Sequence, residues 1–199
     1  MTAPELGDDS PPFVLGAIAG ISAWTLGYVF TFLLVAPEID GSLLQEIIQA
    51  VDGDPATHEM VGWVFYNAHF VDTVVRDVPI VGTGTTNFIG GEDGFTLLLY
   101  LIPIAVLFAI GLAVGRAAHP ETPGRGLLAG LTVLPGYLLL SVGGVFLFEV
   151  DAVGITAGPD FLGAILLAGI LYPAVFGGAG GVLAALTGDR KGKQQQTQE

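Results

Sequence analysis

The residues most able to do chemistry lie in one segment, positions 58–76, which has the sequence HEMVGWVFYNAHFVDTVVR. His69, Asp72 and Arg76 follow one another at helical spacing, so a helix would place them on one face. A histidine beside an aspartate can accept a proton or bind a metal, and Asp72 can pair with Arg76. His58 and Glu59 lie almost three turns earlier, too far along one straight helix to join His69.

The same segment also fits an amphipathic helix lying at the membrane surface. Trp63, Tyr66 and Phe70 occupy positions i, i+3 and i+7, and such aromatic side chains favour the membrane–water interface. A metal site needs three or four ligands, which a lone histidine does not supply. We therefore favour an interfacial helix with a solvated charged face, and expect no catalytic residue, metal or cofactor. The candidate binding residues are Trp63, Tyr66, His69, Asp72 and Arg76.

Motifs of known enzymes are approached in this sequence but not completed. His58-Glu59 begins a zinc-protease pattern, yet Gly62 stands where the second histidine belongs. The sequence has no cysteine, which excludes disulfides and thiolate metal sites. An enzyme would have to use His58, Glu59, His69 and Asp72.

Four uncharged apolar stretches must position this segment. Each has the roughly 20 residues needed to cross about 30 Å of hydrocarbon, and none alternates as a barrel strand would. The expected fold class is all-α, a four-helix transmembrane bundle with one or two interfacial amphipathic helices between helices 1 and 2. The predicted spans are 13–36, 95–115, 126–148 and 161–187, with an outer segment at 37–94, an amino-terminal tail at 1–12 and a disordered tail at 188–199.

The positive charges predict the orientation of the chain in the membrane. Four crossings place five basic residues on one side and only Arg76 on the other, so both termini are expected to be cytoplasmic. Those five are Arg116, Arg125, Arg190, Lys191 and Lys193. A fifth crossing through 60–81 would bury Asp72 and Arg76 at a few kcal/mol each, which argues against it.

Small residues recur along the predicted spans and predict close helix packing, within one bundle or between copies. The expected packing positions are Gly16, Gly20, Gly27, Gly111, Gly115, Gly126 and Gly130. Pro103, Pro135 and Pro173 fall inside spans and are expected to kink them. No span contains an ionisable residue, which argues against a proton-coupled pump. Ser22, Thr25 and Tyr28 share a face and are expected to form hydrogen bonds between helices, or else to line a weakly polar path.

The composition indicates a salt-rich habitat and excludes nucleic acid as a partner. The 199-residue chain has 19 acidic and 6 basic residues, a net charge of −13, and only two lysines. Molar salt screens the resulting self-repulsion, and nucleic-acid binding needs basic patches. With its four spans, acidic loops and FYNAHFVD segment, the chain resembles small uncharacterised multi-pass membrane proteins of haloarchaea, some of them loosely labelled transporters. The resemblance implies habitat and membrane location, and no functional residues.

The sequence thus predicts an integral protein of the cell membrane with a structural, accessory or partner-binding role. One alternative is a small oligomeric transporter or channel, and a second is the membrane-bound enzyme described above. The expected partners are the lipid bilayer and a second copy or another membrane protein.

Overall fold

Four long apolar helices form the body of the protein, as the sequence predicts. The computed structural model describes residues 11–40, 42, 46, 49, 56–80, 82–91, 94–152 and 154–196, with side chains up to Gly188. Its helices long and apolar enough to cross a membrane are Phe13–Ile39, Leu97–Ala118, Pro123–Leu147 and Phe161–Gly188. Large apolar side chains on them face outward; Leu33, Leu139 and Leu162 are each about two-thirds exposed. Such outward-facing leucines suit lipid rather than water, which indicates a multi-pass membrane protein.

Two of the four spans are irregular at the positions where proline was expected to kink them. The first span is one helix, α1 (Phe13–Ile39), and the second is η1 (Leu97–Tyr100) followed by α4 (Leu101–Ala118), with Pro103 in the first turn of α4. The third is divided into α5 (Pro123–Leu131) and α6 (Leu134–Leu147), with Pro135 at the start of α6. The fourth runs through α7 (Phe161–Gly163), the π-helical η2 (Ala164–Leu171) and η3 (Pro173–Gly177), and α8 (Gly178–Gln196). A proline lacks the N–H of an α-helical hydrogen bond, so a break or a wider turn accommodates it.

The carboxyl-terminal segment is helical for most of the length that was predicted to be disordered. Helix α8 continues past the fourth span to Gln196. Once a helix is formed, each further residue adds one hydrogen bond without a new nucleation cost, and Lys, Arg and Gln are good helix formers. The prediction considered only the polarity of this segment and did not consider that the preceding helix could continue into it.

An antiparallel sheet joins the two connections at one end of the bundle, so the all-α prediction is wrong. Its strands are β1 (Thr73–Val78), β2 (Gly82–Thr86), β3 (Val150–Ala152) and β4 (Ile155–Pro159), in the order β2-β1-β4-β3. Val75 of β1 lies opposite Ala157 of β4, far away in the sequence. The strands are too short for a clear period-two pattern, and their pairing is non-local. Helix α3 (Thr57–Asn67) precedes β1 and ends well before Arg76, where the predicted helix was expected to end.

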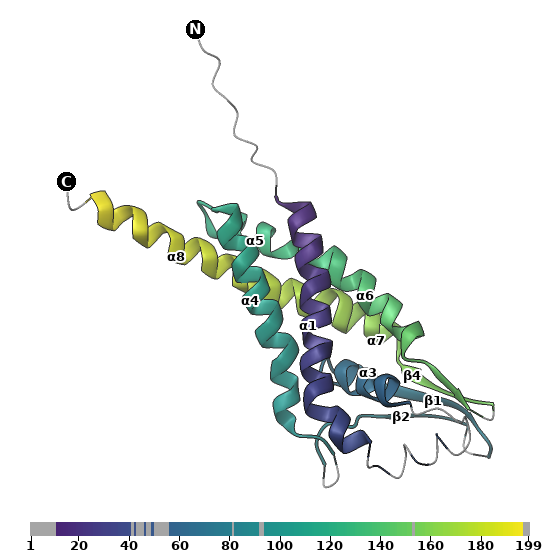
Figure 1. The fold of residues 1–199 in the computed structure, drawn as a ribbon. Coiled ribbons are helices and arrows are strands. Elements are labelled where there is room, and N and C mark those ends of the chain that lie inside the picture. The colour runs from purple at the N-terminus through teal and green to yellow at the C-terminus, as the bar shows by residue number, and fades with distance from the viewer. Residues whose placement is uncertain are drawn as a thin grey trace.

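The sheet lies at one end of the bundle, and the start of α1 and the end of α8 lie at the other (Figure 1). We call the end with β1–β4 the sheet end, and the opposite end, with the α4–α5 turn, the basic end. Helices α1 and α4 run side by side, while α6 and α8 cross them at an angle, and α3 lies between α1 and the sheet (Figure 1).

Glycines lie where the helices approach most closely. A Cβ added at Gly130 of α5 would be 2.2 Å from the carbonyl oxygen of Gly177, and one at Gly111 of α4 would be 2.1 Å from the same oxygen. A Cβ at Gly20 of α1 would be 2.0 Å from the carbonyl oxygen of Val133. The other predicted packing positions also face neighbouring elements closely: Gly16, Gly27, Gly115 and Gly126. Only glycine allows these backbones to approach so closely.

Candidate functional site

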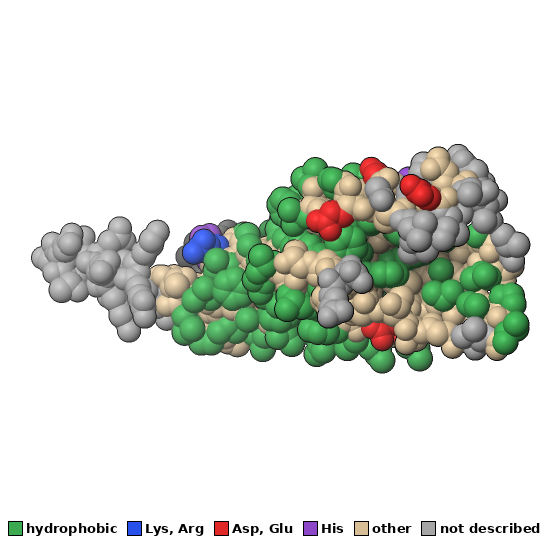
Figure 2. Space-filling view, turned by 90° about the horizontal axis from the view of Figure 1, so that it is seen from below, with side chains coloured by type: hydrophobic (Ala, Val, Ile, Leu, Met, Phe, Trp, Pro, Cys, Tyr) green, Lys and Arg blue, Asp and Glu red, His purple; other side chains and the backbone are tan. Residues whose placement is uncertain are grey.

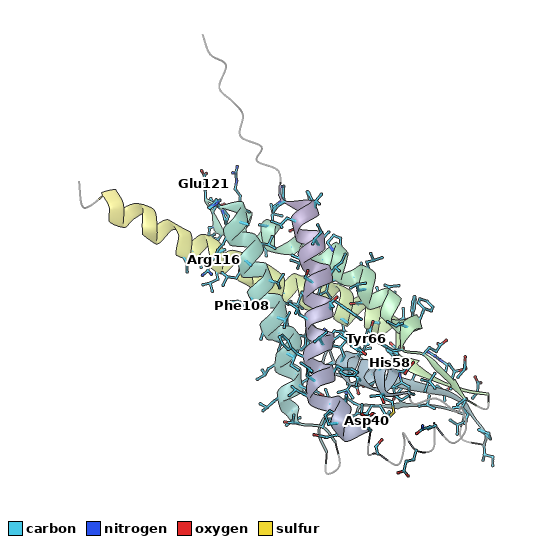
Figure 3. The ribbon with its side chains drawn as sticks, in the orientation of Figure 1. Asp40, His58, Tyr66, Phe108, Arg116 and Glu121 are labelled. Carbon is cyan, nitrogen blue, oxygen red and sulfur yellow. The ribbon has the colours of Figure 1, made fainter. Side chains whose placement is uncertain are left out.

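Helix α3 is buried on all its sides, which corrects the prediction of an interfacial helix with a solvated face. Every residue from Met60 to Asn67 is buried, and Tyr66 and Asn67 have no exposed surface. The exposed polar residues of α3 are confined to its first turn, where His58 is exposed and Glu59 half-buried. Figure 3 labels His58 and Tyr66 on this helix, inside the angle between α1 and the sheet. Two of the aromatic residues that favoured an interface, Trp63 and Tyr66, are buried against the bundle, whereas Phe70 is 60% exposed.

Hydrogen bonds of three aromatic side chains help to attach α3 to the bundle helices. The Trp63 indole N–H donates to the carbonyl oxygen of Phe148 at 2.7 Å, and the Tyr66 hydroxyl donates to the carbonyl oxygen of Ser141. The Tyr28 hydroxyl of α1 donates to the carbonyl oxygen of His58 at 3.3 Å. Burial is the main cause that raises the pKa of Tyr66, so its hydroxyl remains a donor. Because the partners come from both α1 and α6, the helix is held in one position.

Beyond the end of α3, the chain carries His69 into the interior of the bundle. Its imidazole is completely buried, with Nδ1 2.8 Å from the carbonyl oxygen of Phe65 and Nε2 2.7 Å from the hydroxyl of Tyr137. A carbonyl oxygen only accepts, so Nδ1 carries the hydrogen, and Nε2 accepts the hydroxyl hydrogen of Tyr137. Burial lowers the pKa of His69 to about 4, although the bond to Phe65 opposes the shift. The ring is therefore neutral at neutral pH.

The surroundings of His69 are the irregular parts of the third and fourth spans. Tyr137 lies near the middle of the span Pro123–Leu147, little more than one turn after the break at Thr132 and Val133. Tyr172 lies between η2 and η3; its ring centroid is 4.8 Å from that of His69, and its hydroxyl donates to the carbonyl oxygen of Ala68. Irregular backbone at membrane depth is tolerated where it is buried in protein or lines a cavity. His69, on the chain just after α3, thus lies where the broken third span meets the π-helical fourth span.

Comparison with known proteins gives a family for this chain. A model described as a family of unknown function (DUF7978) matches residues 3–188. The chain belongs to DUF7978. No curated protein matches it, and no solved structure does. The DUF7978 match covers the four spans, α3 and the sheet, so the His69 site lies within the region that defines the family.

The structure of this DUF7978 chain separates the other residues that the sequence placed beside His69. Helix α3 ends at Asn67, and Phe70 takes a left-handed conformation with φ 58, so Asp72 and Arg76 are not on a helix with His69. Asp72 is exposed, and Arg76 lies in β1 opposite Thr156. Within the described ranges, Asp72 and Arg76 form no ion pair. The predicted face of His69, Asp72 and Arg76 is therefore wrong, because the chain leaves the helix before completing it.

The residues proposed for an enzyme are likewise not assembled into a site. His58 Nε2 lies 3.9 Å from Glu59 Oε1 on an exposed turn, whereas His69 is buried. In the part of the chain that the structure describes, no three His, Asp or Glu side chains are grouped as metal ligands would be. The four residues therefore differ in both exposure and surroundings.

The predicted polar face of α1 does not form one path or a set of interhelical bonds. The Ser22 and Thr25 hydroxyls are exposed and donate to carbonyl oxygens of their own helix, at Ile18 and Ile21. Tyr28 alone bonds to another element. A hydroxyl that faces lipid donates to a carbonyl oxygen of the preceding turn because no other acceptor is within reach. This explains why Ser22 and Thr25 form no bonds between helices.

The arrangement around His69 allows one chemical change without movement of the backbone, which is protonation of the imidazole. Protonation would make Nε2 a donor, so the Tyr137 hydroxyl would have to turn from donor to acceptor. Of the residues the structure describes, no carboxylate pairs with His69, and a buried imidazolium would be poorly compensated. The sequence signal that could have found this site is His69 itself: an ionisable residue within an aromatic run that is too apolar for a solvated loop.

Proposed function

We propose that this chain is an accessory membrane protein that binds a protein partner through the edge of its outer sheet. The observation that carries the proposal is strand β2, Gly82–Thr86, which pairs with β1 on one side. Four of its five residues are exposed, and Thr86 is half-buried. Among the described residues, no strand pairs with its other side.

An edge strand of this composition is open to pairing. Exposed edges present unpaired N–H and C=O groups, and proteins usually protect them with lysine, proline or a bulge. Strand β2 has the sequence GTGTT and carries neither charge nor proline. The irregularity in the β1–β2 pairing lies between Val75 and Val78, towards the hairpin turn. An extended segment of a partner could therefore add to β2 through main-chain hydrogen bonds.

The inserted helix supports this role because it fixes the sheet to the bundle. Helix α3 leads into β1 and is bonded to α1 and α6, and Asp160 N donates to the carbonyl oxygen of Asp72 beside the sheet. The Asn67 side chain donates to the carbonyl oxygen of Val71 and accepts from Phe88 N, both at 2.8 Å. A sheet that is already ordered loses little entropy when a partner binds.

The distribution of charged residues suggests which side of the membrane the sheet faces and at what salt concentration the protein works. On the face shown in Figure 2, acidic side chains and a histidine lie towards the sheet end, and Lys or Arg and histidine side chains lie at the opposite end. We infer that the sheet faces outward, that both termini are cytoplasmic, and that the protein works at molar salt, where 19 acidic against 6 basic residues are screened.

The test uses lysine to block the edge without disturbing the fold. Thr83 and Thr85 are exposed, so Thr83→Lys with Thr85→Lys should leave the protein folded but prevent strand addition. His58→Lys, exposed on α3 at the same end, is the matched control. The size of the complex is measured after mild solubilisation of native membranes at high salt. We expect the wild type and the control to run as one larger complex and the double variant to lose it.

A crosslink identifies the occupant of the edge. Because the chain has no cysteine, Thr85→Cys places one reactive group on β2. A disulfide-linked dimer would identify a second copy, and a crosslink to another membrane protein a hetero-partner. A monomeric wild type, or a double variant that keeps its complex, would refute the proposal.

A gated transporter is the second candidate, and the convergence at His69 favours it. Breaks and wide turns in two spans that meet at one buried histidine are the features of helices that rearrange around a substrate. Solute flux into liposomes that contain the purified chain would test it. Flux that changes with Tyr137→Phe would favour transport over the accessory role, and absence of flux in both proteins would remove this candidate.

A further inference from the structure

A cavity of about 650 Å³ lies at the basic end of the bundle, between the end of α4 and the last turns of the fourth span. The helices touch just below it, where a Cβ at Gly115 would be 2.7 Å from the Cβ of Ala184. Above this contact α4 ends at Ala118, and its C-cap residue His119 has a left-handed φ of 46. The lining residues are Arg116, His119, Pro120, Ala184, Thr187 and Gly188.

We propose that this cavity binds a phosphate group carried by the headgroup of an anionic membrane lipid. Arg116 is exposed and, among the described residues, has no acidic partner. A guanidinium offers several N–H donors in a planar fork that matches phosphate oxygens. His119 also lines the cavity and adds a ring N–H, and Ala184 gives an apolar part of the lining for the carbon atoms of the headgroup.

The position of the cavity points to a lipid as the carrier of the phosphate. Arg116 is the first charged residue after the uncharged stretch of α4, and Gly188 is the last residue of the fourth candidate span. The cavity thus lies at the level where the spans end, which is the level of the headgroups. Leu186, on the same turns of α8, is half-exposed to the side and would face the acyl chains. Basic pockets between membrane helices at this depth bind anionic headgroups.

The carboxyl end of α4 opposes the binding of an anion, but the positive side chains of this region outweigh it. The carbonyl groups at the carboxyl end of α4 carry about half a negative charge. Arg116 carries a full positive charge, and Arg190, Lys191 and Lys193 follow Gly188 in the sequence. The opposing acids nearest in sequence are Glu121 and Asp189. The net charge of this region therefore favours phosphate.

The binding test compares three probes on the purified full-length chain in detergent. Native mass spectrometry would measure the retention of phosphatidylglycerol and of phosphatidylcholine with matched acyl chains, with and without inorganic phosphate as competitor. We expect phosphatidylglycerol to be retained and phosphatidylcholine to be lost. Inorganic phosphate that displaces the lipid at equal concentration would assign the site to soluble phosphate and overturn the lipid assignment. Equal retention of both lipids, or of neither, would overturn the site.

The variants separate the cavity from the general charge of the protein. A Cβ at Gly188 meets nothing within 4 Å, so Gly188→Asp adds a carboxylate without a clash, and Gly188→Asn is its uncharged match. We expect Gly188→Asp to lower phosphatidylglycerol retention roughly tenfold and Arg116→Gln roughly fivefold, whereas Gly188→Asn retains it. Arg76→Gln at the sheet end should have no effect. Unchanged retention in Gly188→Asp would show that the lipid binds elsewhere.

Discussion

At the residue scale, the site depends on the hydrogen bond between the Tyr137 hydroxyl and Nε2 of His69. Tyr137→Phe would leave this buried nitrogen without a donor, and an unsatisfied buried acceptor costs about 1–2 kcal/mol. We expect a lower midpoint of thermal unfolding in detergent. Tyr100→Phe is the control, because the Tyr100 ring stacks on Phe70 outside the bundle interior and keeps that contact. Equal unfolding midpoints for the two variants would show that the bond contributes nothing.

The neutral state of His69 predicts a dependence of stability on pH. Folding lowers the pKa of His69 from its usual 6.5 to about 4, so the unfolded chain binds the proton more readily. Stability is therefore fully present above about pH 6.5, falls as the pH drops towards 4, and loses nothing further from this group below that. The loss is about 3 kcal/mol, since one pKa unit corresponds to about 1.4 kcal/mol.

Unfolding midpoints of wild type and His69→Gln, measured from pH 7.5 to pH 4, check this dependence. The glutamine variant keeps a polar side chain but does not titrate, and the 19 acidic residues are common to both proteins. The difference between the two curves isolates the histidine. Parallel curves would mean that His69 has access to solvent or to a charged partner.

The sequence singled out candidate binding residues in this segment but did not predict how they are arranged. Trp63, Tyr66 and His69 were candidate binding residues, and all three are buried, the first two on α3 and His69 just beyond its end. Their environment was missed because hydropathy and spacing describe a single helix, whereas burial depends on the neighbours. Asp72 and Arg76 were misplaced because a left-handed residue, Phe70, ends the helical path, and nothing in its side chain signals this conformation.

At the element scale, the bundle depends on glycines that let backbones touch. Gly130→Ala would place a methyl group 2.2 Å from the carbonyl oxygen of Gly177, and neither backbone can move alone. We expect a loss of about 1–3 kcal/mol in stability, as for other overpacked sites. Gly143→Ala on α6 meets nothing within 4 Å and serves as the matched control.

The control should be neutral or slightly stabilised, because alanine is the better helix former. Both variants are compared with the wild type by unfolding in mixed detergent. A Gly130→Ala protein as stable as Gly143→Ala would show that the backbones of α5 and η3 are not in close contact.

The elements differ in how far the sequence could predict them. The spans follow from length and hydropathy alone, because lipid leaves the helix as the main solution for such stretches. The sheet could not be read in the same way: β1 pairs with β4, and each strand has at most six residues. A short strand is defined by its partner, and no local pattern identifies a partner in another connection.

At the scale of the whole molecule, the two ends of the bundle differ in both charge and structure. The connections 37–94 and 148–160 meet in one sheet, and Arg116 and Arg125 lie beside the α4–α5 turn at the opposite end (Figure 1). The parity of four crossings predicted that these two connections share a side. Their union in a sheet requires it, because strands that are hydrogen-bonded to each other cannot lie on opposite sides of a membrane.

Cysteine labelling tests this division most directly, since the chain has no native cysteine. Thr85→Cys on β2, Glu149→Cys before β3 and Gly188→Cys at the basic end each place one exposed thiol. A membrane-impermeant maleimide is added to intact cells and to permeabilised cells. Positions 85 and 149 are expected to label in intact cells, and position 188 only after permeabilisation. Labelling of 188 together with 85, or of 85 without 149, would contradict a four-span protein with one outer sheet.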